Sequence, residues 1–208
     1  FEKIALPYDD YTDFDIKNRH IYIESSRGCP FTCEFCLSSI DSSMRYLPID
    51  VFLNEIDKLW NRGARNYKFI DRTFNLKISY AKAILDYFLA KDEDYFLHFE
   101  VIPDNFPPEL RELLKKFKAG SLQLEVGIQT LNLDVAKNIN RNLKIDKIKE
   151  NLAFLSSETN AHMHIDLIVG LPSETIDSFA QNLNLLYTLS SGEIQIGILK
   201  KLSGTTLN

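Results

Sequence analysis

Segments with the pattern of a buried strand alternate with segments of helical pattern along nearly the whole chain. The predicted strands cover residues 20–24, 66–71, 95–101, 121–128, 162–169 and 193–199. The predicted helices begin at Pro48 and recur near 78–90, 108–118, 133–140, 145–156 and 175–189. Parallel neighbours need a crossover connection, which a helix provides. The alternation therefore predicts an α/β fold with a parallel sheet and outer helices, either doubly wound or a barrel.

The chain length suits one domain with a full core, because 208 residues lie in the ordinary size range of domains. Residues 1–19 are polar and rich in Asp with little periodicity, and we interpret them as a leader or linker. The domain proper is then predicted over residues 20–208. Because the chain starts with Phe1 and ends in a loop-like Gly204–Asn208 segment, we expect a fragment of a longer protein.

The charge and hydropathy pattern narrows the classes of partner. A net charge of −5 disfavours general binding to nucleic acid, which normally meets a basic surface. No stretch approaches the roughly 18 apolar residues of a membrane-spanning helix, and the N-terminus lacks the apolar region of a signal peptide. We expect a cytoplasmic protein without a membrane partner.

All three cysteines of the chain lie within eight residues, in the spacing Cys29-x-x-x-Cys33-x-x-Cys36. They follow the first predicted strand, at the end where α/β folds bind ligands. Three thiolates can hold three irons of a cubane cluster and leave the fourth iron open. A structural zinc site needs four ligands, and the nearest further candidate, His20, lies on the other side of the strand. The spacing favours a cluster with an open iron.

This cysteine motif, with Phe35 directly before the third cysteine, resembles the radical S-adenosylmethionine (SAM) superfamily. The resemblance implies a partial TIM-like (β/α)6 barrel and a 4Fe-4S cluster held by Cys29, Cys33 and Cys36. It also implies that SAM chelates the open iron and is cleaved reductively to a 5′-deoxyadenosyl radical. An external electron donor such as flavodoxin or ferredoxin would supply the electron. The substrate, a small molecule or another unknown compound, could be methylated or rearranged.

The resemblance extends to residues that would contact SAM, which lie at or near later strand ends. It places Asp71 near the amino group of SAM, Arg141 near its carboxylate and Ile168 in the segment that contacts adenine. Gln129 lies in a Gly-Ile-Gln-Thr segment shared with relatives, and Glu100 lies on the polar face of an alternating strand. Together with the aromatic residue of the cysteine motif, the predicted SAM-binding residues are Phe35, Asp71, Glu100, Gln129, Arg141 and Ile168.

Other polar residues near these positions have roles that the sequence leaves open. Arg72 follows Asp71 where many relatives carry a second acidic residue, and His98 is interpreted as a core residue in preference to a ligand. His162, His164 and Asp166 alternate along one strand and so share a face. Two His at such positions could bind a metal, but the upstream cysteines make a metal site here the disfavoured interpretation.

Within the superfamily, the strongest likeness is to proteins with a cobalamin-binding domain. The chain is also similar to methylthiotransferase-like and coproporphyrinogen-dehydrogenase-like members. No cobalamin-binding His motif is present in the sequence, so we expect cobalamin, where it is used, to bind in a domain absent from this chain. The alternative function is a non-catalytic iron–sulfur module for electron transfer or redox sensing, which a fourth cysteine would favour.

Overall fold

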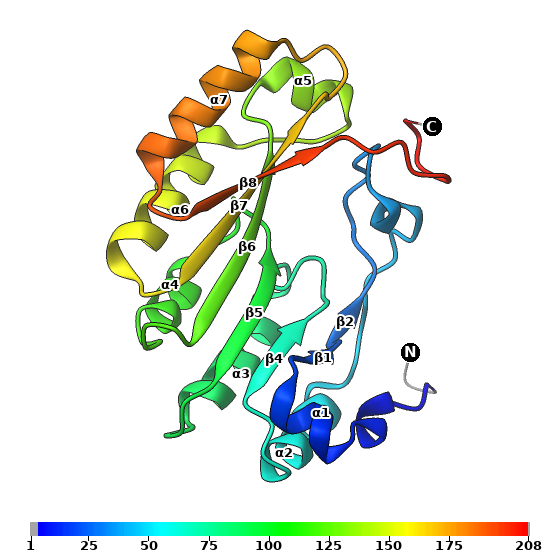
Figure 1. Ribbon diagram of the computed structural model, residues 1–208, viewed down its shortest axis with the longest axis vertical. Helices are drawn as coiled ribbons and strands as arrows, with labels where there is room; N and C mark the ends of the chain where they lie inside the picture. The colour runs from blue at the N-terminus through cyan, green and yellow to red at the C-terminus, as the bar shows by residue number, and fades with distance from the viewer. Residues whose placement is uncertain (1–3, 208) are drawn as a thin grey trace.

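Six parallel strands form the central sheet of the computed structural model, which describes residues 4–207 (Figure 1). The strands are β1 (Ile21–Ile23), β4 (Asn66–Phe69), β5 (Phe96–Val101), β6 (Leu122–Gln129), β7 (His162–Val169) and β8 (Glu193–Ile198). They are neighbours in chain order, from β1 to β8. A doubly wound sheet would reverse its strand order at one point. The order therefore settles the fold as a partial (β/α)6 barrel, as predicted.

The crossover helices lie on the outer side of this sheet, as the left half of Figure 1 shows for α4, α6 and α7. The helices are α2 (Ile49–Asn61), α3 (Ile78–Leu89), α4 (Pro108–Leu114), α5 (Leu133–Asn138), α6 (Ile145–Glu158) and α7 (Ile176–Leu189). In α2, the buried side chains are Phe52, Ile56, Leu59 and Trp60. Their spacing of four, three and one residues gives the helix one apolar face, which explains its docking on the sheet.

The two faces of the sheet differ in chemistry because side chains alternate along each strand. In β6, the even-numbered residues from Leu122 to Ile128 are buried and the odd-numbered ones are only partly buried. Phe99 of β5 joins the buried side, where its ring stacks on Phe74 with 3.7 Å between centroids. The apolar core thus lies between sheet and helices, and the opposite, concave face carries the polar residues.

Residues 7–18, which the sequence predicts as part of a leader or linker, fold onto the domain instead. They form η1 (Pro7–Asp10) and α1 (Asp13–Asn18), which begins with a capping box between Thr12 and Asp15. Tyr8 and Ile16 are buried in the main apolar core. The capping box has the Thr-x-x-acid pattern of a helix start, with Asp in place of the usual Glu.

The cysteine segment is enclosed by a small antiparallel pair outside the main sheet, formed by β2 (Ser26–Arg27) and β3 (Arg45–Tyr46). A short 3-10 helix, η2 (Leu37–Ile40), follows the third cysteine. Figure 1 shows this segment beside the C-terminal end of the chain, across from the outer helices. Among the helices within residues 4–207, none is both long enough and apolar enough to span a membrane.

Candidate functional site

A cavity of about 460 Å³ lies between the cysteine loop and the concave face of the sheet. All three cysteines line it, together with Glu100 of β5 and Glu125 of β6. The thiols are free, and those of Cys29 and Cys33 are buried. Burial raises the pKa of the Cys29 thiol, an effect that the Arg141 guanidinium opposes. The cavity thus has a sulfur-rich wall and a carboxylate-rich wall.

The turn that starts the cysteine loop requires glycine. Gly28 has a φ of +99°, and a Cβ at this position would overlap the Ser43 carbonyl oxygen. The next residue is held to the same segment, because the Cys29 amide donates to the Asp41 carbonyl at 3.2 Å. Close backbone approach and a positive φ are both available only to glycine here. The residue before the first cysteine therefore shapes the loop.

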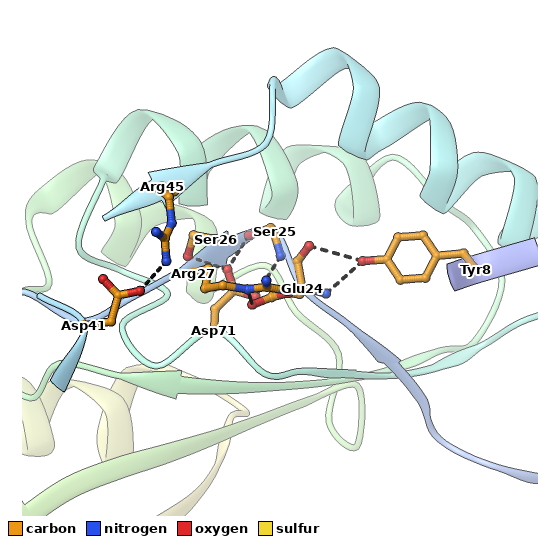
Figure 2. A network of polar contacts seen from close by, with 8 residues as sticks. All are labelled: Tyr8, Glu24, Ser25, Ser26, Arg27, Asp41, Arg45 and Asp71. Atoms are coloured by element: carbon orange, nitrogen blue, oxygen red, sulfur yellow. Dashed lines mark hydrogen bonds and ion pairs between the residues drawn. The ribbon is translucent and has the colours of Figure 1, made fainter. Parts of the chain in front are cut away.

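Asp71 supports the start of the same loop from below, as the network in Figure 2 shows. Its carboxylate accepts hydrogen bonds from the Ser25 amide at 3.0 Å, the Ser25 hydroxyl at 2.5 Å and the Ser26 hydroxyl at 2.6 Å. Asp71 is 1% exposed and is not among the residues that line the cavity. Burial raises its pKa against the effect of these hydrogen bonds. The predicted contact of Asp71 with SAM therefore has no support from the geometry.

The far side of the cysteine loop is held by the segment after α5. The Asn140 side chain donates to the Thr32 hydroxyl at 2.6 Å, and the Glu34 amide donates to the Ile139 carbonyl at 3.1 Å. Asn140 has a φ of +53°, a left-handed conformation that Asn tolerates better than most residues. This contact joins residues 108 positions apart in the chain. It places Arg141 directly beside the cysteines.

Arg141 connects the cysteine loop to β6. Its Nη1 donates to Cys33 Sγ at 3.5 Å, and its Nη2 donates to the Gly127 carbonyl. Its Nε is buried without a hydrogen-bond partner among residues 4–207, as is Thr73 Oγ1, and both residues line the cavity. Buried polar groups normally have partners, so these two atoms indicate a polar ligand. The free thiols and unpartnered donors fit a cluster with a polar ligand beside it.

Three carboxyl groups on the concave face share the opposite wall of the cavity. Arg72 Nη1 contacts both oxygens of Glu100, at 2.9 and 3.2 Å, yet burial still raises the Glu100 pKa. A hydrogen bond from His98 Nε2, 2.9 Å from Oε2, lowers the pKa of Glu125. Burial first, and then the nearby Glu125 and Glu100, raise the pKa of Asp166 to about 7. Crowding of like charges at low dielectric disfavours ionisation of all three groups together.

Four of the six predicted SAM-binding residues line the cavity, namely Phe35, Glu100, Gln129 and Arg141. Ile168 is instead half-buried and packs on a small apolar cluster, against which Phe35 also packs. The cavity lining also includes Arg72, Thr73, Asn140 and Asp166. Of these, Thr73 carries no sequence signal, because a single Thr after a strand is common in loops.

Gln129 ends β6 in an unusual backbone conformation. Its φ is +70°, and the pairing of β6 with β7 shifts register between Gly127 and Gln129. Such strained, bulged positions cluster at functional sites. The next residue, Thr130, is buried and donates to Glu174 Oε1 at 3.0 Å. The bulge turns the Gln129 side chain toward the cavity while Thr130 anchors the strand end.

Comparison with known proteins agrees with this geometry. The sequence profile of the radical SAM superfamily matches residues 23–186. The ribosomal protein uS12 methylthiotransferase RimO of Nitratiruptor sp. is 23% identical over 177 residues, which are 81% of this chain and 41% of that protein. The cobalamin-dependent radical SAM methyltransferase TokK of Streptomyces tokunonensis is 25% identical over 190 residues, 85% of this chain and 27% of that protein.

Solved structures share the fold at low sequence identity. The radical SAM methyltransferase TsrM from Kitasatospora setae, with cobalamin and a 4Fe-4S cluster bound, matches with a TM-score of 0.80 and 17% identity, over 94% of this chain and 39% of that one. Coproporphyrinogen III oxidase (HemN) from Escherichia coli, a radical SAM enzyme, matches with a TM-score of 0.66 and 20% identity, over 88% and 44% of the chains. This chain thus spans less than half of each of these relatives.

Proposed function

Because this chain belongs to the radical SAM superfamily, we propose that residues 20–208 form the catalytic core of a radical SAM enzyme. In this proposal Cys29, Cys33 and Cys36 hold a 4Fe-4S cluster, and SAM occupies the adjoining cavity. The proposal rests on one observation: three free thiols and Arg141 form one side of a cavity whose other side carries carboxyl groups. The chain has no fourth cysteine, so a fourth iron would keep a position for SAM.

The residues of the chain would hold and orient the bound groups. When bound, the reduced cluster and SAM together supply a 5′-deoxyadenosyl radical that removes a hydrogen atom from the substrate. Arg141 is suited to a carboxylate of SAM because its Nε is buried and unpartnered within residues 4–207. Gln129 can donate to or accept from a neutral polar group at the end of β6. Phe35 borders the cavity next to the third cysteine and gives it an apolar surface there.

The carboxylate wall would face the substrate. Glu100 is charge-balanced by Arg72, and Glu125 is hydrogen-bonded to His98, so both are already engaged. Asp166 is the carboxyl group of this wall with the pKa nearest neutrality. A group of this kind can accept or donate a proton near physiological pH. These features support a small-molecule substrate with a polar or basic group, bound against β5, β6 and β7.

The test is anaerobic reconstitution of the cluster followed by addition of SAM and a strong reductant. We expect about four irons per chain, as a cubane cluster requires, and formation of 5′-deoxyadenosine. C33A is expected to lose iron and product together. S42A is the matched control, because Ser42 is an exposed residue of the same loop. An intact cluster that never yields 5′-deoxyadenosine, even with the chemical reductant, would contradict the enzymatic proposal and favour a non-catalytic iron–sulfur module.

Methyl transfer is the subsequent reaction that the similarity to TokK and TsrM favours. TokK is a cobalamin-dependent methyltransferase, and TsrM is a methyltransferase whose solved structure contains cobalamin. SAM labelled in its methyl group would separate the outcomes: label in the product supports methyl transfer, whereas label found in methionine alone supports rearrangement. Repeating the reaction with added cobalamin would test whether cobalamin is used. Replacing the chemical reductant by flavodoxin or ferredoxin would test the proposed electron donor.

A further inference from the structure

Three potential metal ligands lie at the amino-terminal ends of β7 and β8, at the other end of the strands from the Gln129 bulge. His162 and His164 are the first and third residues of β7, so both project from the same face of the strand. Glu193 is the first residue of β8 and is the register partner of His164. None of the three lines the cavity of the cysteines. They form a separate cluster, here called the His–Glu cluster.

The ligand atoms of the His–Glu cluster are close together. The two Nε2 atoms of His162 and His164 are 3.0 Å apart. Glu193 Oε2 lies 3.3 Å from His164 Nε2, and Glu193 Oε1 lies 3.5 Å from His162 Nε2. A tetrahedral ion with ligands at 2.0–2.1 Å separates those ligands from one another by about 3.3 Å. The three observed distances, of which the two to Glu193 involve different oxygens of its carboxylate, lie within a few tenths of an ångström of this spacing. With one ligand atom taken from each residue, the three atoms lie within 4.8 Å of one another.

We propose that the His–Glu cluster binds one divalent transition-metal ion of the zinc type, through both Nε2 atoms and the Glu193 carboxylate. Two imidazoles and a carboxylate are a preferred donor set for zinc. The side chains are 48%, 21% and 66% exposed for His162, His164 and Glu193, so solvent can reach the site. A fourth coordination position is therefore open to water.

Hydrogen bonding alone does not satisfy these three groups. A neutral imidazole has one N–H and one lone pair, so only one of the two facing Nε2 atoms can donate to the other. The accepting Nε2 then has no proton to offer the Glu193 carboxylate, and two lone pairs face each other. Two imidazolium rings would instead point N–H groups at one another across 3.0 Å. A cation accepts all three lone pairs at once and removes this conflict.

The surroundings of His164 also suit a metal ligand. Its Nδ1 lies 2.6 Å from the amide nitrogen of Gln195 and 3.2 Å from the amide nitrogen of Gln123. A half-turn of either amide presents its oxygen to the ring, because amide oxygen and nitrogen occupy equivalent positions. That oxygen would accept from Nδ1–H and leave the Nε2 lone pair for the metal. Metal-bound His residues usually have such a partner behind the ring.

A metal ion at this site would link the edge strand β8 to the neighbouring strand β7. Within residues 4–207, β8 pairs on one side only, with β7, and most of its residues are exposed. A bound ion would link the first residue of β8 to two residues of β7. Because the ion binds the folded chain, it should stabilise it. The inference concerns a site apart from the cysteines and does not depend on SAM chemistry.

The experiment measures zinc on the cluster-loaded chain. Equilibrium dialysis against Zn²⁺, with iron and zinc counted by mass spectrometry, should find one zinc per chain while the iron content stays constant. The cysteines also bind zinc when the cluster is absent, so the measurement is repeated on the C29A/C33A/C36A variant. We expect H162A, H164A and E193Q each to weaken zinc binding tenfold or more. H20A is the matched control, since His20 is an exposed His outside the cluster.

Zinc binding by the wild-type chain and its variants decides whether the proposal holds. Zinc absent from the wild-type chain, or zinc retained at unchanged affinity in the H162A/H164A double variant, would overturn the proposal. If that double variant does not fold, E193Q decides, because it replaces one exposed carboxylate by an amide of the same shape. As a second readout, zinc should raise the melting temperature of the wild-type chain by more than that of E193Q at the same zinc concentration. Iron content and 5′-deoxyadenosine formation report separately on the cluster.

Discussion

At the residue scale, two glycines of this protein differ in whether the structure has room for a side chain at their positions. Gly28 and Gly63 have nearly the same backbone conformation, with φ of +99° and +101°. A Cβ on Gly28 would overlap a backbone carbonyl, whereas a Cβ on Gly63 would meet no atom within 4 Å. The two positions therefore separate the cost of a strained φ from the cost of blocking the cysteine loop.

We predict that G28A loses most of its cluster iron and that G63A keeps it. Both variants should lose about 1–2 kcal/mol of unfolding free energy from the left-handed backbone, and only G28A also displaces the segment that carries Ser43. Iron content after reconstitution and urea unfolding measure the two effects. Equal iron content in both variants would show that the Gly28 turn does not shape the cluster site.

Arg141 gives a second prediction at this scale. Its guanidinium already donates to Gly127 and Cys33 and keeps Nε free within the described chain. Lysine has a single ammonium group in place of the planar set of N–H donors of the guanidinium. R141K should therefore weaken SAM binding to the cluster-loaded chain about tenfold, which corresponds to about 1.4 kcal/mol. Calorimetric titration with SAM measures it, and R19K, which changes an exposed arginine of α1's C-cap, should bind SAM like the wild type.

At the element scale, the short N-terminal helices belong to the domain. Ile16 of α1 is 4% exposed and lies in the main core, whereas Phe14 of the same helix is 64% exposed. Tyr8 of η1 contacts the residue that follows β1, because its hydroxyl donates to the Glu24 carbonyl at 3.1 Å and accepts from the Glu24 amide at 2.9 Å. These contacts brace the chain directly before the cysteine loop.

We predict that I16A lowers the unfolding free energy by about 2–3 kcal/mol, near the lower end for a buried aliphatic side chain because α1 is peripheral. F14A should change it by less than about 0.5 kcal/mol. Chemical denaturation of the two variants provides the comparison. Equal, small effects would mean that α1 is detached in solution, as a linker would be.

At the scale of the whole molecule, the sheet divides an apolar side from a polar one. The outer side is filled by side chains such as Phe69 and Phe99, while the concave side carries the cavity and the His–Glu cluster. Putting several carboxyl groups on one partly buried face has an electrostatic cost that depends on pH. Asp166 carries the largest part of it, with its pKa raised from 3.8 to about 7.

We predict that the free energy of unfolding of the metal-free chain falls as pH rises from about 4 to about 7. In this window Asp166 is protonated in the folded chain and ionised in the unfolded one, so the folded state binds more protons. Rising pH therefore favours unfolding, by at most ~1.4 kcal/mol per pH unit and by less for a partly exposed group. D166N should reduce this slope without abolishing it, because burial also raises the pKa of Asp71 and of Glu100. Chemical denaturation of the wild-type chain and of D166N across this pH range, in a chelating buffer, measures the two slopes. Parallel plots of unfolding free energy against pH for the two proteins would contradict the raised pKa of Asp166.

The sequence predicts much of this molecule because strand alternation, helical spacing and the cysteine motif are local patterns. Backbone sterics set each pattern over a few residues, so the strand and helix order and the loop after β1 could be read directly. Glu100, Gln129 and Arg141 line the cavity, and their contact with SAM stays a prediction. The N-terminal helices were missed, because the Thr12–Asp15 cap is short and precedes no long periodic run.

Which residues meet was decided by the tertiary structure alone. Ser25 and Ser26 occupy the Asp71 carboxylate, so Asp71 supports the loop instead of lining the cavity. Glu193 reaches the His pair only because β8 pairs with β7 in one particular register. Such contacts join distant parts of the chain, and a shift of one residue in register would turn each side chain to the opposite face. The sequence by itself determined the elements and the cysteine motif, and packing determined the partners of each side chain.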